Sequence, residues 1–398
     1  MPETIFNLGF TMPNTTKPSV VAVGELLWDM FPDGRKPGGA PANFIYHVAQ
    51  NGVQGTAVTA VGNDDLGRDL VSILADNGVN VAAQVNDYPT GVTAVRLDDN
   101  GIPEYDVVKG VAWDHIEFTD NVRALVRAAD AICYGTIAAR EAWGTRDTIY
   151  QMIDAARPDA IRLFDINIRS GFVNKEVITR FLEGATVLKI NDEELPIVAN
   201  LFGLDSPGKD IRSQQRAMRT LCEMFNLDVA ILTAGDAYSI VMGHDEISIL
   251  PTPQVEVADT VGAGDSFSGA FLAYLLRGFA IPAAHRRAVD VSAFVCSQSG
   301  AWPRYPQELR EQHLTACRRS DPAIHFSNRP LAIRGILSSG TSSMKKDSPC
   351  HNTTLFPALP SALRSVGCCT ATTPQLSTAQ PQSSKNTSIP AMPCSALP

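Results

Sequence analysis

The sequence predicts a three-layer α/β/α domain with a mostly parallel central sheet. Short apolar runs that favour strands alternate with longer amphipathic stretches that favour helices, from about residue 18 to residue 329. The strand-like runs are mainly apolar, as expected for strands that helices cover on both faces. A chain of 398 residues is long enough for one large domain of this kind and further segments.

The predicted elements follow one another in strand–helix order. The strands are Val20–Val23, Thr56–Val61, Ile132–Tyr134, Leu163–Asp165, Val187–Ile190 and Val229–Thr233. The helices, which have apolar residues at helical spacing, are Ala42–Gln50, Leu66–Asp76, Asn121–Ala129, Ala142–Ala156, Ile211–Phe225 and Ala283–Ser297. Strands separated by helices pair in parallel, which gives the predicted sheet.

One segment departs from this order. Thr90–Leu97 and Ile102–Val108 are strand-like runs on either side of Asn100 and Gly101, a pair typical of hairpin turns. This insertion, at about 87–111, is either a β lid that closes over a site or an edge hairpin that extends the sheet. A lid could also pair with that of a second copy in a homodimer, or stand alone.

The ends of the chain differ from its body. Residues 1–17 form a polar N-terminal extension, and 330–398 is a Ser/Thr/Pro-rich segment. We expect the latter to be a disordered tail, because it has too few apolar residues to form a core. The net charge of −9 argues against nucleic-acid binding, and no apolar run approaches the ~20 residues of a membrane span. The expectation is a cytoplasmic protein with neither nucleic-acid nor membrane partners.

The strongest chemical signal is the run Gly262-Ala263-Gly264-Asp265, directly before an apolar helical stretch. Small residues that open a helix leave backbone N–H groups free to bind an anion such as a phosphate. Asp265 then lies at the mouth of the anion site, where it could take a proton from a hydroxyl group. The alternative is that Asp265 only caps the helix, as Asp often does.

These residues carry a resemblance to a known family. Asp259–Asp265 resembles the signature of the ribokinase or PfkB family of carbohydrate kinases, and Gly38–Asn43 resembles its N-terminal glycine signature. Gly24–Asp29 is similar to the family's first strand with its substrate aspartate, in wording nearest to the fructokinase branch. The resemblance covers about residues 18–310 and implies a ribokinase-like fold.

The resemblance also implies a reaction, the ATP-dependent phosphorylation of a sugar hydroxyl. The first expectation is conversion of D-fructose to fructose 6-phosphate, with a sugar and ATP as the small-molecule partners. Ribose, another ketose, a 2-keto-3-deoxy sugar acid or a nucleoside remain alternative acceptors. A catalytically inactive member that acts as a binding protein is the non-enzyme alternative.

Roles for single residues follow from the same resemblance. The catalytic residues would be Asp265, as the base, and Gly262, Ala263 and Gly264, whose amides form the anion hole. The substrate residues would be Asp29, Gly38, Gly39, Asn43, Asn167 and Arg169. ATP would be bound by Asn191, Glu194, Thr233 and Gly235, with Glu194 acting on Mg²⁺. A monovalent cation, K⁺, would be held by Asp259, the carbonyl of Val261 and the turn from Val295 to Gly300.

Two positions depart from the family pattern. Tyr238 stands where the motif Thr-x-Gly-x-x-Gly has its last glycine, and Ile166 stands where fructokinases usually have proline. The tyrosine at position 238 puts in doubt how the adenosine part of ATP fits into the nucleotide site. The sequence also contains no phosphate-binding P-loop, and Val20–Asp29 lacks the glycine pattern of a Rossmann dehydrogenase.

Overall fold

The computed structural model describes residues 17–31, 34–97, 103–142, 144–168 and 172–311. Arg169, the hairpin turn at Asn100 and Gly101, and the expected tail at 330–398 lie outside the described residues. All statements below about what the fold contains refer to the described ranges.

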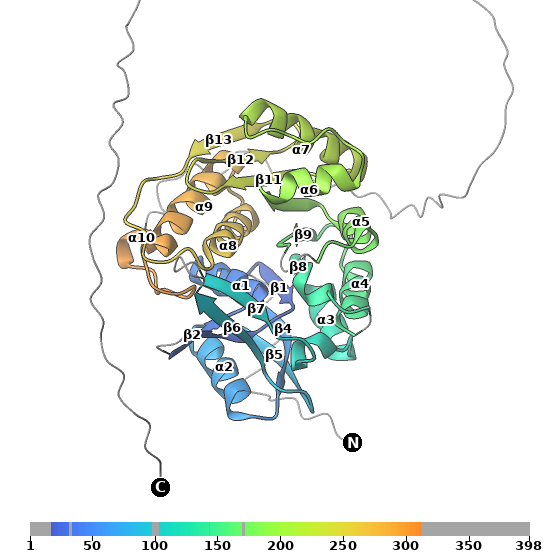
Figure 1. Ribbon diagram of the computed structural model, residues 1–398, viewed down its shortest axis with the longest axis vertical. Coiled ribbons are helices and arrows are strands. Elements are labelled where there is room, and N and C mark those ends of the chain that lie inside the picture. The colour runs from blue at the N-terminus through green and yellow to red at the C-terminus, as the bar shows by residue number, and fades with distance from the viewer. Residues whose placement is uncertain (1–16, 32–33, 98–102, 143, 169–171, 312–398) are drawn as a thin grey trace, which may run out of the picture. The chain divides into compact units, whose positions relative to one another are not determined.

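The centre of the fold is a mostly parallel sheet (Figure 1). Nine strands of the described ranges form it, in the order β13-β12-β11-β10-β9-β8-β1-β4-β5. They are β1 (Ser19–Val23), β4 (Gln54–Gly62), β5 (Asn80–Asn86), β8 (Ala131–Gly135), β9 (Ile161–Asp165), β10 (Val187–Asn191), β11 (Val229–Ala234), β12 (Tyr238–Met242) and β13 (Ile247–Pro251). All neighbouring strands from β11 to β5 pair in parallel. At the other edge, β12 pairs antiparallel with β11, and β13 pairs antiparallel with β12.

Helices cover both faces of this sheet. One layer contains α1 (Ala40–Gln50), α2 (Asp65–Asp76), α8 (Ala263–Leu276) and α9 (Ile281–Cys296). The other contains α3 (Asp120–Ala128), α4 (Thr145–Ala155), α5 (Lys175–Gly184), α6 (Glu194–Leu201) and α7 (Ile211–Phe225). Short elements are α10 (Gln307–Glu311) and the 3₁₀ turns η1 (Ala112–His115) and η2 (Ile137–Ala139).

The two layers are separated by the alternation of strand side chains. In β1, Val21 and Val23 pack into one core cluster, whereas Val20 and Ala22 pack into the other. Because successive strand residues point to opposite faces, a wholly apolar strand serves two helix layers. The predicted three-layer architecture is therefore confirmed.

A second, smaller sheet lies apart from the first. Its four strands in the described ranges have the order β3-β2-β6-β7 and are β2 (Leu27–Phe31), β3 (Gly34–Gly38), β6 (Gly91–Leu97) and β7 (Pro103–Val107). β6 and β7 are the predicted hairpin strands and pair antiparallel. They do not extend the central sheet, so the edge-hairpin alternative is wrong. Half of the small sheet comes from residues 27–38, which the sequence did not predict as strands.

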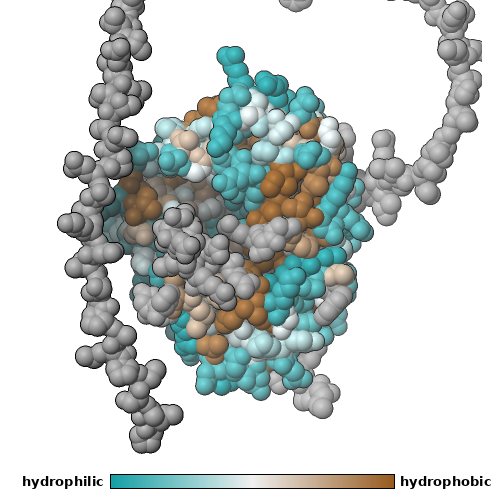
Figure 2. All heavy atoms as spheres, viewed as in Figure 1, coloured by the Kyte–Doolittle hydropathy of each residue, from teal (hydrophilic) through white to brown (hydrophobic). Residues whose placement is uncertain are grey.

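The face drawn in Figure 2 carries both hydrophilic and hydrophobic residues. Hydrophilic residues lie mostly toward the top and bottom of the face in Figure 2, and hydrophobic residues gather nearer its middle. No helix of the described residues has the length and hydropathy that a membrane span requires.

Candidate functional site

The main cleft of the described residues lies at the carboxyl edge of the parallel strands. Glu25, Asn167, Asn191 and Thr233, which follow or end β1, β9, β10 and β11, all line this cleft of about 800 Å³. In open α/β sheets, ligands bind at this edge. The small sheet contributes to the same cleft through Asp29 and Thr93, and α8 contributes its N-terminus.

The N-terminus of α8 contains the four residues that the sequence singled out as catalytic. Gly262 occupies the N-cap position with φ of 75°, a conformation that favours glycine, and a Cβ there would lie 2.6 Å from Cβ of Ala301. Ala263, Gly264 and Asp265 form the first turn and line the cleft. Since Gly262 occupies the N-cap and Asp265 lies in the first turn, Asp265 is not the N-cap residue.

A chain of hydrogen bonds orients Asp265. The Asn43 amide Nδ2 donates to Asp265 Oδ2 at 2.9 Å, and Trp302 Nε1 donates to Asn43 Oδ1 at 2.7 Å. An indole N–H can only donate, so the oxygen of Asn43 must face Trp302 and its NH₂ must face Asp265. Asn43 is buried at the cleft wall. The structure thus gives Asn43 a role in positioning Asp265, beside any contact with a substrate.

Two further carboxyl groups lie at this end of the cleft. Burial raises the pKa of Asp29 to about 6, against a hydrogen bond from Thr93 that lowers it. Burial likewise raises the pKa of Glu25 to about 8, and its Oε1 accepts a hydrogen bond from Ala40 N at 3.2 Å. Asp29 lies within β2, the strand that follows β1 in the sequence and belongs to the small sheet.

The glycine pair Gly38 and Gly39 packs against these carboxyl residues. A Cβ on Gly38 would collide with Oδ2 of Asp29, and a Cβ on Gly39 would collide with the carbonyl oxygen of Glu25. Gly39 lines the cleft and has φ of 107°, whereas Gly38 is not part of the cleft wall. Gly38 therefore acts on a ligand only indirectly: because it has no side chain, the carboxylate of Asp29 can occupy its position in the cleft.

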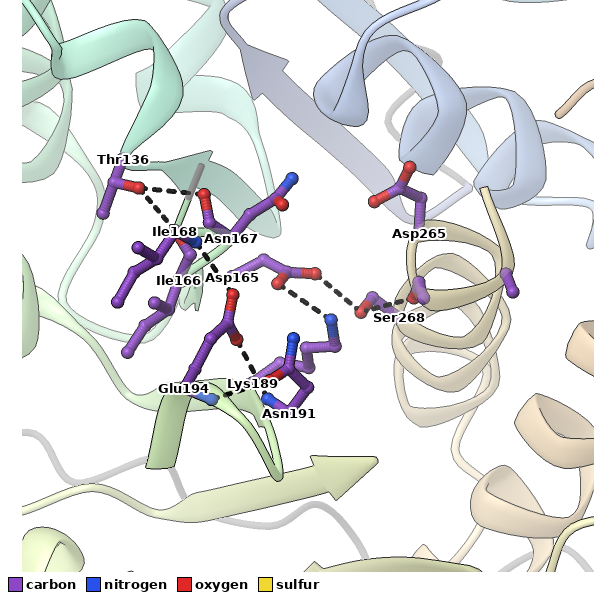
Figure 3. A network of polar contacts seen from close by, with 12 residues as sticks. Thr136, Asp165, Ile166, Asn167, Ile168, Lys189, Asn191, Glu194, Asp265 and Ser268 are labelled. Atoms are coloured by element: carbon purple, nitrogen blue, oxygen red, sulfur yellow. Dashed lines mark hydrogen bonds and ion pairs between the residues drawn. The ribbon is translucent and has the colours of Figure 1, made fainter. Parts of the chain in front are cut away.

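A buried polar network joins β9, β10 and α8 beneath the anion site (Figure 3). Lys189 Nζ lies 3.1 Å from Asp165 Oδ1, and Ser268 Oγ donates to Asp165 Oδ2 at 3.0 Å. Burial alone would lower the pKa of Lys189, but nearby carboxylates, above all Asp165, outweigh it and raise the pKa. A Cβ on Gly264 would lie 3.1 Å from Lys189 Nζ. The ammonium group therefore lies against the first turn of α8.

The turn after β9 is held from both sides (Figure 3). Asn167 has φ of 48°, which few residues other than glycine adopt. Thr136 Oγ1 donates to the carbonyl of Ile166 at 2.7 Å, and Glu194 Oε1 accepts from Ile168 N at 2.8 Å. Ile166 N donates to Lys189 O at 3.1 Å, a bond that a proline at this position could not make.

Glu194 closes the turn that contains Asn191. Its Oε2 accepts from Asn191 N at 3.0 Å, and Asn191 Oδ1 accepts from Glu194 N at 2.8 Å. Glu194 is buried, and this burial raises its pKa against the opposing effect of Lys189. Each of its two oxygens keeps further acceptor capacity toward the cleft that it lines.

The far end of the cleft is more open. Thr233 and Gly235 line it at the end of β11, and Gly235 has φ of 51°. Tyr238 borders this part with its ring, while its hydroxyl donates to Gln214 Oε1 at 2.6 Å on α7. The hydroxyl also lies 3.0 Å from the carbonyl oxygen of Lys209, so it is held outside the cleft wall.

The residues expected to bind K⁺ lie around one carboxylate. Asp259 Oδ1 accepts from Val261 N at 3.0 Å, and Oδ2 accepts from Gly300 N at 3.1 Å. The carbonyl of Val295 accepts from Gln298 N at 3.0 Å. The ammonium group of Lys36 lies 3.5 Å from Asp259 Oδ2. Within the described ranges, no group of three or more His, Cys, Asp or Glu side chains is placed to hold a metal ion.

The cleft brings together most residues that the sequence singled out. Those lining it are Asp29, Gly39, Asn43, Asn167, Asn191, Glu194, Thr233, Gly235, Val261, Gly262, Ala263, Gly264 and Asp265. Gly38, Asp259, Val295 and Gly300 lie outside its wall. The sequence reasoning missed Glu25, Lys189 and Trp302 as site residues, although Glu25 stands inside the quoted segment Gly24–Asp29 and Lys189 inside a predicted strand. A charged residue in an otherwise apolar strand, such as Lys189 in β10, was a usable signal.

Comparisons with known proteins agree with this geometry. Residues 27–308 match the sequence model of the pfkB family of carbohydrate kinases. Fructokinase-1 of Zea mays is 27% identical over 316 residues, which cover 73% of this chain and 95% of that protein.

Two solved structures share the fold. One is 2-dehydro-3-deoxygluconokinase of Thermotoga maritima, with a TM-score of 0.66 and 19% identity, covering 74% of this chain and 98% of that one. The other is a candidate ribokinase II of E. coli in complex with ATP and Mg²⁺, with a TM-score of 0.61 and 21% identity, covering 72% and 94%. Since the family match spans most of the chain, this protein belongs to the pfkB family of carbohydrate kinases.

Proposed function

We propose that this kinase transfers the γ-phosphoryl group of ATP to a hydroxyl group of D-fructose and forms fructose 6-phosphate. The observation that carries the reaction type is the position of Asp265 in the first turn of α8. It lies beside the amides of Gly262–Gly264 and is oriented by Asn43. One carboxylate and one anion site at the same helix end are what phosphoryl transfer to an alcohol needs.

In the proposed reaction, Asp265 takes the proton of the sugar hydroxyl as that oxygen bonds to the γ-phosphorus. The bond from the γ-phosphorus to the bridging oxygen breaks, and ADP leaves with its electron pair. The amides of Gly262, Ala263 and Gly264 donate to the oxygens of the phosphoryl group in flight. Lys189, charged and held by Asp165 beneath the same turn, adds positive charge there.

Substrate binding is assigned to the end of the cleft with Asp29. Asp29 would accept hydrogen bonds from two sugar hydroxyls, and Asn167 and Gly39 would contact the sugar from the opposite walls. Arg169, outside the described residues, keeps its expected role as a clamp for phosphate or sugar. ATP would occupy the end with Thr233 and Gly235, and a solved E. coli structure of the same fold contains ATP and Mg²⁺.

Mg²⁺ fits the cleft as an ion bound to ATP and to water. Glu194 has unused acceptor capacity on both oxygens, which suits hydrogen bonds from water ligands of the ion. Mg²⁺ commonly keeps several waters, so a direct ligand cluster is not required. When bound, the ion would neutralise phosphate charge, and Asn191 would hold the Glu194 turn in place.

Support for fructose comes from the maize fructokinase, which is 27% identical. The likeness to 2-dehydro-3-deoxygluconokinase keeps a keto-deoxy sugar acid as the second candidate. A coupled ADP-release assay against fructose, ribose, other ketoses, keto-deoxy sugar acids and nucleosides tests the proposal. We expect fructose to give the highest kcat/KM. A higher value for a sugar acid or a nucleoside would reject fructose and leave the kinase chemistry standing.

A further inference from the structure

Lys36 links the small sheet to the loop that leads into α8. It lies on β3 directly opposite Asp29 of β2, so both side chains are on the same face of the small sheet. Its Nζ donates to Ser299 Oγ at 2.9 Å and lies 3.5 Å from Asp259 Oδ2. A Cβ on Gly300 would touch its side chain at 3.4 Å. Lys36 thus contacts both the segment before α8, at Asp259, and the turn after α9, at Ser299 and Gly300.

The carboxylate of Asp259 is already well supplied with partners. Oδ1 accepts from Val261 N, and Oδ2 accepts from Gly300 N and faces the Lys36 ammonium. With a side-chain exposure of 18%, Asp259 is partly shielded from water, so this contact is less screened than a fully exposed pair.

Two of the surrounding carbonyl groups also accept hydrogen bonds. The carbonyl of Cys296 accepts from both Ala258 N and Asp259 N, at 2.9 and 3.2 Å. The carbonyl of Val295 accepts from Gln298 N. An alkali ion needs several oxygens turned toward one point, whereas these oxygens bond to backbone amides. The residues expected to bind K⁺ therefore do not fit an additional ion well, because an ammonium group already supplies one positive charge at the only carboxylate among them.

We propose that Lys36 is the resident cation of the Asp259 loop and takes the place of an alkali ion. Its charge holds the carboxylate that fixes Val261, one residue before the N-cap of α8. The anion hole then forms without K⁺, and the small sheet is tied to it. The kinetic part of this proposal rests on the proposed kinase function, whereas its cation-binding part does not.

The test compares the wild-type protein with Lys36→Met, which keeps the length of the side chain and removes its charge. Lys36→Arg keeps the charge, and Lys109→Met removes an exposed lysine that is distant in sequence and pairs with Glu141 at 3.8 Å. Each protein is measured in KCl and in tetramethylammonium chloride of equal ionic strength. The two readouts are sugar-dependent ADP release and the melting temperature.

We expect the wild-type protein, Lys36→Arg and Lys109→Met to differ less than about twofold in kcat/KM between the two salts. Lys36→Met should lose about tenfold in tetramethylammonium chloride and regain most of that loss in KCl. Its melting temperature should rise with K⁺, as ligand linkage requires, while that of the wild-type protein should not.

Three results would overturn the proposal. One is stimulation of the wild-type protein by K⁺ together with a K⁺-dependent rise in its melting temperature. Another is a Lys36→Met protein that matches the wild type in both readouts. The third is a loss in Lys36→Met that K⁺ does not restore. If no acceptor in the panel is phosphorylated, the proposed function fails, and the melting temperatures still decide the cation site. If Lys36→Met does not fold, the wild-type response to K⁺ decides alone.

Discussion

The two ends of the cleft are built differently. At the proposed sugar end, Glu25 and Asp29 are only 3% and 7% exposed, and Asn43 donates a hydrogen bond to Asp265. At the proposed nucleotide end, Val255 and Val257 line the cleft with exposures of 39% and 59%. Preorganised polar groups are needed where bonds change, and burial together with hydrogen bonds fixes their positions. If this end holds the nucleotide as proposed, its open and partly apolar surface should tolerate departures such as Tyr238.

The largest difference in turnover between changes at the two ends of the cleft should come from Asp265→Asn. This variant keeps the size of the side chain and its partner Asn43, but it loses the basicity and the charge. We expect turnover at saturating substrate to fall at least ~10²-fold, since general base catalysis contributes about that much. Asp192→Asn, which removes a cleft carboxylate at the nucleotide end, is the matched control and should stay within about threefold. Equal losses in both variants would argue against a special role of Asp265.

Glu25→Gln should change how stability depends on pH. Burial raises the pKa of Glu25 from 4.5 to about 8, so between these values the folded protein holds a proton that the unfolded chain has released. Stability from this group is complete below pH 4.5 and is lost as pH rises toward 8, by up to about 1.4 kcal/mol per pH unit.

Glutamine does not titrate, and its side-chain oxygen can still accept a hydrogen bond from Ala40 N. Glu25→Gln should therefore remove this group's contribution to the fall of the unfolding free energy with rising pH. The measurement is urea unfolding at several pH values between 5 and 8. Glu176→Gln, an exposed change on α5, should leave the slope as it is. An unchanged slope in Glu25→Gln would show that this carboxyl is not held protonated.

Asn43→Ala should have an intermediate effect on catalysis. Without the amide, Asp265 loses the donor that orients it, and we expect kcat to fall about fivefold at saturating sugar and ATP. Trp302→Phe removes only the indole donor to Asn43 and should lower kcat less. Steady-state kinetics separates the roles, because pure sugar binding by Asn43 would raise KM for the sugar and leave kcat unchanged.

The sequence predicted most of the central sheet but little of the small one. β1, β4 and β8 to β11 are apolar runs between helical patterns, which is a strong local signal. β2 and β3 contain Trp28, Asp29, Arg35 and Lys36 beside glycine and proline, and their pairing is set by tertiary contacts. A pattern of side-chain types carries no information of that kind.

The same limit applies to the site. The family motifs identified Asp265, the glycines and Asn43 by type and order. They could not show that Asn43 faces Asp265, because that direction depends on Trp302, which is 259 positions away. Likewise, the pairing of Lys36 with Asp259 joins two segments far apart in the sequence. Contacts of this range are known only once the chain is folded.

Tyr238→Gly, which restores the glycine of the family pattern, should have the smallest kinetic effect. Its hydroxyl bonds to Gln214, which does not line the cleft, although Tyr238 itself does. We expect KM for ATP to change by about threefold or less, with kcat unchanged. Tyr238→Phe removes the hydroxyl alone and should give nearly wild-type kinetics. A tenfold rise in KM for ATP in Tyr238→Gly would show that the ring is part of the adenosine site.

The most direct test of the division between the two ends is a calorimetric titration of the Asp265→Asn protein with MgATP. If Asp265 serves the chemical step and the far end of the cleft holds the nucleotide, Kd should stay within about threefold of the wild-type value, or fall slightly as a negative charge is removed. A Kd that rises in proportion to the loss of turnover would contradict the account, because Asp265 would then act in ATP binding and not as the base.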